Sequence, residues 1–507
     1  MDLEQHILAV VEPELSPTEI TFEDFNEEDG GDRQSKTIGA VAPVVQVNGF
    51  QFTGEMIERV NLNLSDVLPS IKLVLNDTTQ AFGLEFMPRD GDVITLLINS
   101  KNTDTFKTIH MDFEITSISL STDEEDGSPE INISGNAKIP KYFAETCRNF
   151  EAGTSLDHLE LIARDLKIGL ATNIETTDDS MPRVQPYIPT FQFIEDIVDN
   201  SYIAENSFQR YHIDQFYYLN FVDVNKVFNS ENSSIETLQE SLTTFATSIA
   251  EEGNNATEEG ADNIPSKLIL TNAKDAQGTN MFIKEHKLKN NSNRVSQENG
   301  YTRNIMYYDD NNPDVKLTEL TVAAQVSENL ADIDEPLRGR RGETEFEEQV
   351  KFKYMGRHNT GEDGLGNVHS NALFSELNNY QNNAELDKMK VIVKLEAFNP
   401  SLYKYQKVPL LIYNYEREVV EIAKELKTAK EAKGLNESPI AGANDNPITN
   451  EENPDQMLDT FLSGHYVIEN INIIYDIEEG LTQHVTLLRR EWPTRISNIE
   501  GKFNRAE

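Results

Sequence analysis

Two short stretches, "FEITSISL" at residues 113–120 and "YVIENINI" at residues 466–473, decide the fold expected of this chain. Both interleave apolar and polar residues, as is typical of a half-buried β-strand. When Phe113 is placed on Tyr466 the offset is 466 − 113 = 353, and three further apolar residues of the first stretch fall on isoleucines of the second. A near copy at this distance predicts that one β unit occurs twice in the chain.

The next strand along the chain offers an independent check of this repeat. Pro140 falls on Pro493 at the same offset, 493 − 140 = 353, and the 28 residues from 113 to 140 align without a gap. Ile131 and Ile133, however, fall on polar residues, so the hydrophobic phase slips by one residue unless a bulge absorbs it. Two unrelated hairpins of similar length would also fit. We favour two related β-barrel or β-sandwich domains.

Length and composition describe a globular chain. With 507 residues and 38% hydrophobic residues it can form roughly three domains. No apolar run approaches the length needed to span a bilayer, and the first residues carry acids where a signal peptide has bases, so we expect neither stable membrane insertion nor secretion. The single cysteine, Cys147, allows no internal disulfide, which fits folding in a reducing cytoplasm.

The chain is strongly acidic, with 87 acidic and 44 basic residues and a net charge of −43. Such a surface repels phosphate and disfavours tight, sequence-specific binding of nucleic acid. The plain interpretation is solubility. A sharper one is a conduit that nucleic acid passes without sticking.

Changes in composition divide the chain into segments. The expected fold class is α+β, mainly β, with two antiparallel β-barrel or sandwich domains and an α/β module between them. The expected segments are an acidic arm that a partner orders (1–39), a first β domain (40–150), the α/β module (151–226), an acidic linker or loop (227–266), a mixed β/α region (267–388), a second β domain (389–495) with a helix–loop insertion (416–456), and a tail (496–507).

The α/β module shows helical spacing of apolar residues. The first helix should be capped by Thr154, with Asp157 at capping-box spacing, and should end at Gly169. The second should have Thr190 as its N-cap. The elements expected are therefore a helix over 153–169, a helix over 189–203 and a strand over 211–222.

Motifs for catalysis and metal binding are absent from the sequence. It has no HExxH, no GxSxG and no glycine-rich phosphate loop, and its nine histidines are scattered. The acids and amides of "YYDDNNPD" (307–314) lack the glycine and terminal glutamate of a calcium loop and read as an exposed turn. We expect no enzyme activity, no cofactor and no metal.

The order of these segments resembles the baseplate hub protein of contractile-tailed bacteriophages, which is similar to the hub portion of type VI secretion spike proteins. The likeness covers most of residues 40–230 and 370–495. It is carried by "GDVITLLINS" (91–100), "IHMDFEITSIS" (109–119), "GTSLDHLELIARDLKIG" (153–169), "PTFQFIEDIVDNSYIAENSFQRYHIDQFYYLNF" (189–221), "NPSLYKYQKVPLLIYN" (399–414) and "LLRREWP" (487–493).

The resemblance implies a homotrimer with two tail-tube-like domains per chain, which together form a ring of six. Such a ring would adapt a sixfold tail tube to a threefold spike and form part of the DNA exit channel. The implied partners are the tail tube protein or tube initiator, the central spike protein, baseplate wedge proteins and passing DNA, and the implied location is the virion baseplate, after assembly in the host cytoplasm. The arm and the segments 227–266 and 416–456 depart from the compact family pattern.

Two acidic turns are candidate interface sites. They are the tip of the first hairpin, Asp123, Glu124, Glu125 and Asp126, and its counterpart in the second, Glu478 and Glu479. A solvated turn is the plainer interpretation of both.

Three other functions remain open at this point. They are a tail-associated cell-wall hydrolase, another tube-like tail protein such as a tube initiator, and an acidic decoy that mimics DNA.

Overall fold

The computed structural model describes residues 7–20, 43–76, 88–122 except 90 and 100–106, 129–230 except 205 and 206, 237–242 except 240, 268–290 except 278, isolated positions from 369 to 386, 389–414, and 457–489 except 460 and 461. It also describes the backbone of β16 (Thr302–Asp309), β17 (Asn312–Leu320) and β18 (Glu348–Gly356), which pair in a separate three-stranded sheet. None of the helices in these ranges is long and apolar enough to cross a membrane.

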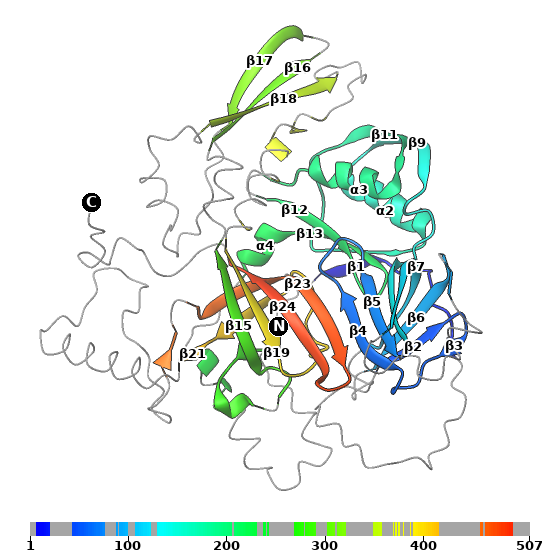
Figure 1. Ribbon diagram of the computed structural model, residues 1–507. Coiled ribbons are helices and arrows are strands. Elements are labelled where there is room, and N and C mark those ends of the chain that lie inside the picture. Colours follow the sequence, from blue (N-terminus) through cyan, green and yellow to red (C-terminus); the bar gives the residue numbers. More distant parts are fainter. Residues whose placement is uncertain are drawn as a thin grey trace, which may run out of the picture.

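One curled, mainly antiparallel sheet of 13 strands dominates the molecule (Figure 1). Its first unit, blue in the figure, consists of β4 (Ile57–Asn63), β5 (Ser70–Asn76), β6 (Val93–Ile98), β7 (Ile109–Thr122) and β8 (Pro129–Ala137). Its second unit consists of β15 (Ile283–Asn290), β19 (Met389–Leu395), β20 (Lys407–Leu411), β23 (Gly464–Asp476) and β24 (Gly480–Leu488). Shorter strands β2 (Val44–Val47), β3 (Phe50–Gln51) and β14 (Leu270–Thr271) extend the sheet. The expected class, α+β and mainly β, is confirmed.

The two units have the same topology. Their strands lie in the order β4-β5-β8-β7-β6 and β15-β19-β24-β23-β20. When the five strands of each unit are numbered along the chain, both units have the spatial order first, second, fifth, fourth, third. Every neighbouring pair of strands within a unit is antiparallel. Two unrelated hairpins would not share the three outer strands as well, so the structure supports the predicted duplication.

Irregularities of the strands recur at equivalent places. The pairing of β7 with β8 is interrupted between Ile115 and Ser117, and that of β23 with β24 between Ile468 and Asn470, 353 residues later. A second pair of bulges interrupts β4 at Glu58 and β15 at Lys284. Since bulges locally bend and twist a strand, a shared position indicates a shared curvature.

The one-residue slip in the alternation of apolar residues arises between the two strands of the hairpin, β7–β8 in the first unit and β23–β24 in the second. Ile115 pairs with Gly135, and its counterpart Ile468 pairs with Leu487, so the offset on the second strand is 487 − 135 = 352. The second hairpin is thus one residue shorter, and Ile133 corresponds to the buried Val485. The gap-free alignment is therefore wrong beyond the turn, and Pro493 lies outside the described residues.

The core does not divide at the expected domain boundaries. A single cluster of buried apolar side chains runs through both units and the α/β module. The boundary drawn at residue 389 is wrong, because it separates β15 from the second unit, although β15 pairs with β19 along its whole length.

The α/β module packs two helices, α2 (Ser155–Leu166) and α3 (Thr190–Asp199), beside the two-stranded antiparallel sheet of β9 (Glu145–Gly153) and β11 (Met181–Pro189). A second sheet has the order β1-β10-β13-β12, made by β1 (Leu8–Val11), β10 (Gly169–Thr172), β13 (Tyr218–Asp223) and β12 (Gln209–Ile213). The short elements are α4 (Val224–Phe228), η3 (Lys274–Ala276), β21 (Tyr413–Asn414) and β22 (Met457–Leu458).

Several local predictions for the module need correction. The left-handed residue that ends α2 is Lys167, with φ of 59°, and Gly169 instead begins β10. The N-cap of α3 is Pro189, and Thr190 is its first residue. The strand expected over 211–222 is a hairpin of two strands, because residues 214–217 form a turn.

Part of the expected N-terminal arm is structured by the chain itself. β1 pairs with β10, and Asp112 accepts hydrogen bonds from the backbone N and the Oγ1 of Thr18 at 2.9 and 2.7 Å. The expectation that a partner orders the arm is therefore wrong for residues 7–20. The insertion 416–456, the tail 496–507 and most of the linker 227–266 lie outside the described residues.

The capping box of α2 is confirmed. Thr154 Oγ1 accepts from the backbone N of Asp157, whose Oδ2 accepts from the backbone N of Thr154 at 2.9 Å. We expect Thr154→Ala to lower the free energy of unfolding by about 1 kcal/mol, because one N–H at the helix start loses its acceptor. Urea unfolding measures this. Thr154→Ser keeps the acceptor and should remain close to wild type.

Candidate functional site

The two units are joined edge to edge by the second half of β23 and by β4. Asn472 pairs with Asn63, Ile473 with Leu62, and the pairing continues to Asp476. The backbone N of Leu64 donates to the carbonyl of Ile471 at 2.9 Å. Ile473 and Leu62 are 2% and 0% exposed. We call this contact the joint; it shows how one unit of this type accepts the edge of another.

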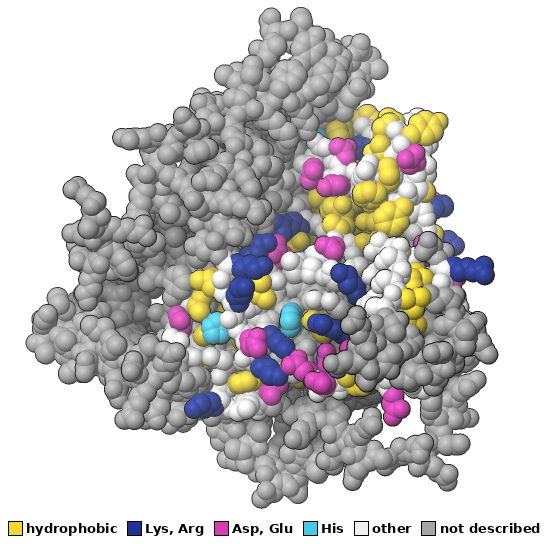
Figure 2. Space-filling view, viewed as in Figure 1, with side chains coloured by type: hydrophobic (Ala, Val, Ile, Leu, Met, Phe, Trp, Pro, Cys, Tyr) yellow, Lys and Arg dark blue, Asp and Glu magenta, His cyan; other side chains and the backbone are white. Residues whose placement is uncertain are grey.

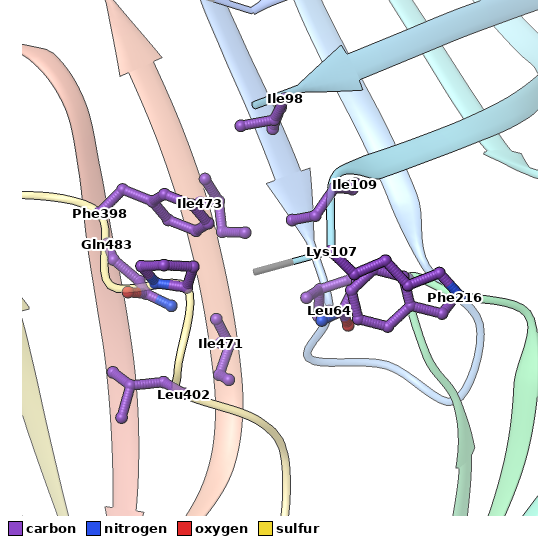
Figure 3. Close-up of a pocket in the computed structure, with 12 residues that line it drawn as sticks. Leu64, Ile98, Lys107, Ile109, Phe216, Phe398, Leu402, Ile471, Ile473 and Gln483 are labelled. Atoms are coloured by element: carbon purple, nitrogen blue, oxygen red, sulfur yellow. The ribbon is translucent and has the colours of Figure 1, made fainter. Parts of the chain in front are cut away.

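The interior of the joint is closely packed. A cavity of about 20 Å³ lies there, with Ile471, Ile473 and Phe398 on the side of the second unit. Figure 3 shows these side chains facing Ile98 and Ile109 of the first unit. A space of this size holds about one water molecule, so the joint is a packing interface and has no room for a ligand.

A buried ion cluster sits at the bulge of β23. The carboxylate of Glu469 accepts hydrogen bonds from Lys390 Nζ at 2.8 and 2.9 Å and from Arg210 Nη1 at 3.1 Å. Glu469 is 5% exposed. Its two partners belong to β19 and to β12, so it ties the α/β module to the second unit. The equivalent bulge residue of the first unit, Thr116, is exposed.

An open cleft of about 370 Å³ lies between the module and the two units. Its lining includes the titratable side chains of Lys404, His212 and Asp214. Burial lowers the pKa of Lys404 to about 8, lowers that of His212 well below its usual value, and raises that of Asp214. Perturbed groups in a cleft are typical of functional sites, but also of structural networks.

The contacts of two of these groups, Lys404 and Asp214, are structural. Lys404 Nζ donates to the carbonyls of Ser65 and Asp66 at 3.0 and 3.3 Å. Asp214 accepts from the backbone N–H groups of Phe216 and Tyr218 and from the amide of Asn220. Both side chains therefore hold loops in place at the edge of the joint.

The shifted pKa of Lys404 predicts how stability depends on pH. The unfolded chain keeps this proton up to about pH 10.5 and the folded chain loses it near 8, so the unfolded state binds more protons between these values. The free energy of unfolding should therefore rise with pH across this window, by up to about 3 kcal/mol from this group. Urea unfolding at pH 7–10 should show a smaller rise for Lys404→Met. An equal rise in the variant would contradict the assignment.

The predicted interface residues are only partly described. Asp123, Glu124, Glu125 and Asp126 lie outside the described residues. Glu478 and Glu479 are exposed in the turn between β23 and β24. Glu479 accepts from Lys394 Nζ at 2.8 Å, and this hydrogen bond holds the pKa of the carboxylate below its usual value. Whether either turn contacts another protein remains a prediction.

Surface chemistry differs between the two ends of the described face. Figure 2 shows basic and acidic side chains mixed over β15, β19 and β24, and hydrophobic side chains gathered over the α/β module. Exposed apolar residues of the module include Val184 and Tyr187. Within the described ranges, no group of three or more His, Cys, Asp or Glu side chains is placed to hold a metal ion.

Neither a protein-family model nor a curated protein matches the chain. Several solved structures do. The tail protein from Neisseria meningitidis MC58 is 8% identical, with 88% of this chain and 96% of that chain covered and a TM-score of 0.46. The 43 kDa tail protein of prophage MuSo2 from Shewanella oneidensis is 11% identical, with 89% and 98% covered and a TM-score of 0.46. The E. coli c3393 protein, a component of the type VI secretion system, is 7% identical, with 89% and 78% covered and a TM-score of 0.38.

Two of these structures are tail proteins, and the third is a component of a type VI secretion system. Because the TM-scores are below 0.5 and the identities are 11% or lower, the likeness alone supports no conclusion about function. The duplicated unit and the joint are properties of the chain itself.

Proposed function

We propose that this chain is a structural hub of a contractile tail baseplate. It would assemble as a homotrimer whose six β units form a ring between a sixfold tail tube and a threefold spike. The observation that carries this proposal is the duplicated five-stranded unit, joined edge to edge within one chain. A closed threefold ring with an internal duplication has six similar positions. The resemblance of residues 40–230 and 370–495 to hub proteins supports the same assignment.

Partners and location follow from this role. The tail tube protein or tube initiator would lie on one face of the ring, the spike on the other, and wedge proteins around it, all in the virion baseplate. DNA would leave through the centre of the ring. The net charge of −43 supports passage without binding, because a negative surface repels phosphate.

The number of copies tests the proposal. Sedimentation equilibrium of the full chain at micromolar concentrations should give three times the chain mass of 57.4 kDa. Electron microscopy of the same sample should show rings with threefold symmetry and six similar lobes. A chain that stays monomeric up to the highest soluble concentration, or that closes into a ring with another number of copies, would overturn the hub assignment.

A further inference from the structure

The two strand edges that meet in the joint have equivalents in the duplicated units, and among the described strands these equivalents bind no further strand. The duplication gives each edge a counterpart in the other unit. β23 corresponds to β7 at an offset of 353 residues. β4 corresponds to β15 at another offset, since Leu62 corresponds to Leu288 (288 − 62 = 226). Inside the chain, the second half of β23 binds β4. The equivalent edges are the second half of β7 and the outer edge of β15. Among the described strands, β15 pairs only with β19, and β7 beyond Glu114 pairs only with β8.

We propose that the second half of β7 in one copy of this chain pairs antiparallel with β15 of the next copy, in the same register as the joint. The occupant of each edge is thus a second copy of the same chain. This inference rests on the proposed function and names the contact that would close the ring.

The register follows from the equivalences. In the joint, Asn472 pairs with Asn63 and Ile473 with Leu62. Their counterparts place Ser119 opposite Lys289 and Leu120 opposite Leu288. These two leucines are 58% and 38% exposed, whereas Ile473 and Leu62 are almost fully buried. The register thus brings together two large apolar side chains that the described chain leaves exposed, at the position where the joint buries its own pair.

Both edges also show the exposure expected of strands that pair with a described strand on one side only. An edge strand presents a row of backbone N–H and C=O groups that can bind another strand. Every side chain from Lys284 to Lys289 is exposed, as are those of Ser119 and Ser121. The edges differ from each other, so each copy offers one of each kind. A contact of this head-to-tail type closes into a ring when its rotation divides a full turn.

The matching bulges favour the same geometry at both contacts. β4 and β15 are interrupted one residue after Ile57 and Ile283, and β7 and β23 one residue after Ile115 and Ile468. Both partners of the proposed contact therefore carry the bend that their counterparts carry in the joint.

Disulfide trapping tests the register directly. Leu120→Cys and Leu288→Cys would be introduced together into the full chain, with the exposed Cys147 replaced by serine. Directly opposite residues in antiparallel strands have Cβ atoms about 4.5–5.5 Å apart, and a disulfide needs about 3.5–4.5 Å, so a small local adjustment of the two strands brings the sulfurs within bonding distance. Mild oxidation should give a ladder of two and then three linked chains on non-reducing gels, with most of the protein in the trimer band.

Two sets of control variants test whether the cross-link reports the proposed register. Each single cysteine variant should give no ladder. The pair Ser119→Cys with Leu288→Cys should cross-link at least tenfold less, because neighbouring residues of a strand point to opposite faces of the sheet. Equal cross-linking of this pair would overturn the register.

A further variant tests the β7–β15 contact without a covalent cross-link. Leu120→Asp should raise the concentration needed for trimer formation at least tenfold, with unchanged circular dichroism and melting temperature of the monomer. Val184→Asp is the matched control, since Val184 is 56% exposed but lies on β11.

The outcomes separate this inference from the proposed function. A trimer by sedimentation that neither cross-links nor responds to Leu120→Asp overturns the β7–β15 contact and leaves the hub assignment standing. A monomer at all concentrations overturns both. A trimer that cross-links through the first pair and dissociates in Leu120→Asp supports both.

Discussion

Replacing Glu469 with glutamine should destabilise the folded chain by about 3–5 kcal/mol. The substitution keeps the shape of the side chain but removes the charge that Lys390 and Arg210 share. The side chains of the two cations are only 20% and 18% exposed, so water screens their mutual repulsion poorly. Loss of one partner of a buried ion pair typically costs this much, because the remaining charge stays desolvated. Urea denaturation of the full chain at pH 7 measures the effect.

A surface ion pair provides the matched control. Glu160 and Arg164 of α2 are 2.8 Å apart, but their side chains are 34% and 58% exposed. Glu160→Gln should change the free energy of unfolding by no more than about 0.5 kcal/mol. If Glu469→Gln were equally mild, the cluster at the bulge would contribute little, and the attachment of the α/β module to the second unit would rest on other contacts, such as the hydrogen bonds from Lys407 Nζ to the carbonyls of Phe228 and Ser230.

The duplication could be predicted from the sequence because its signal is local. Alternating apolar residues mark strands, and one offset relates two strands wherever their spacing is unchanged. The same stretches also contain the bulge. The apolar residues of the first are spaced two, three and two apart, at Phe113, Ile115, Ile118 and Leu120, and those of the second repeat this spacing. The interval of three marks the extra residue, which is Thr116 in one strand and Glu469 in the other.

The joint and the full extent of the second unit could not be predicted in the same way. β15 reads "IKEHKLKN", and only Ile283 and Leu288 in it are apolar, because the exposed edge strand buries few of its residues. Its membership in the second unit is set by pairing with β19, about a hundred residues later. Pairing at that distance depends on tertiary contacts, which periodicity in one strand does not encode.

The two acidic turns illustrate the limits of charge as a signal. Sequence marks Glu478 and Glu479 as exposed, and they are. It does not reveal that Lys394 and Lys284 lie 2.8 and 3.7 Å from the carboxylate of Glu479. By contrast Glu469, between Ile468 and Ile471 in the same strand, is buried and binds two cations. The sequence signal for the structural role of Glu469 is a charged residue at the point where the period-two alternation of the strand is interrupted.

Replacing Ile473 with alanine should lower the free energy of unfolding by about 2–5 kcal/mol, because the joint would lose buried apolar area and retain a cavity. Leu120→Ala, at the equivalent position of the first unit, should change it by less than about 0.5 kcal/mol in dilute solution, where the chain is monomeric and this side chain is exposed. Both values come from urea unfolding at nanomolar protein, followed by fluorescence. At concentrations that favour a trimer, Leu120→Ala should weaken assembly, since the proposed contact buries the leucine against Leu288 of the next copy. Similar losses for both variants in the monomer would mean that residue 120 is already packed within its own chain, and the free edge that the ring requires would not exist.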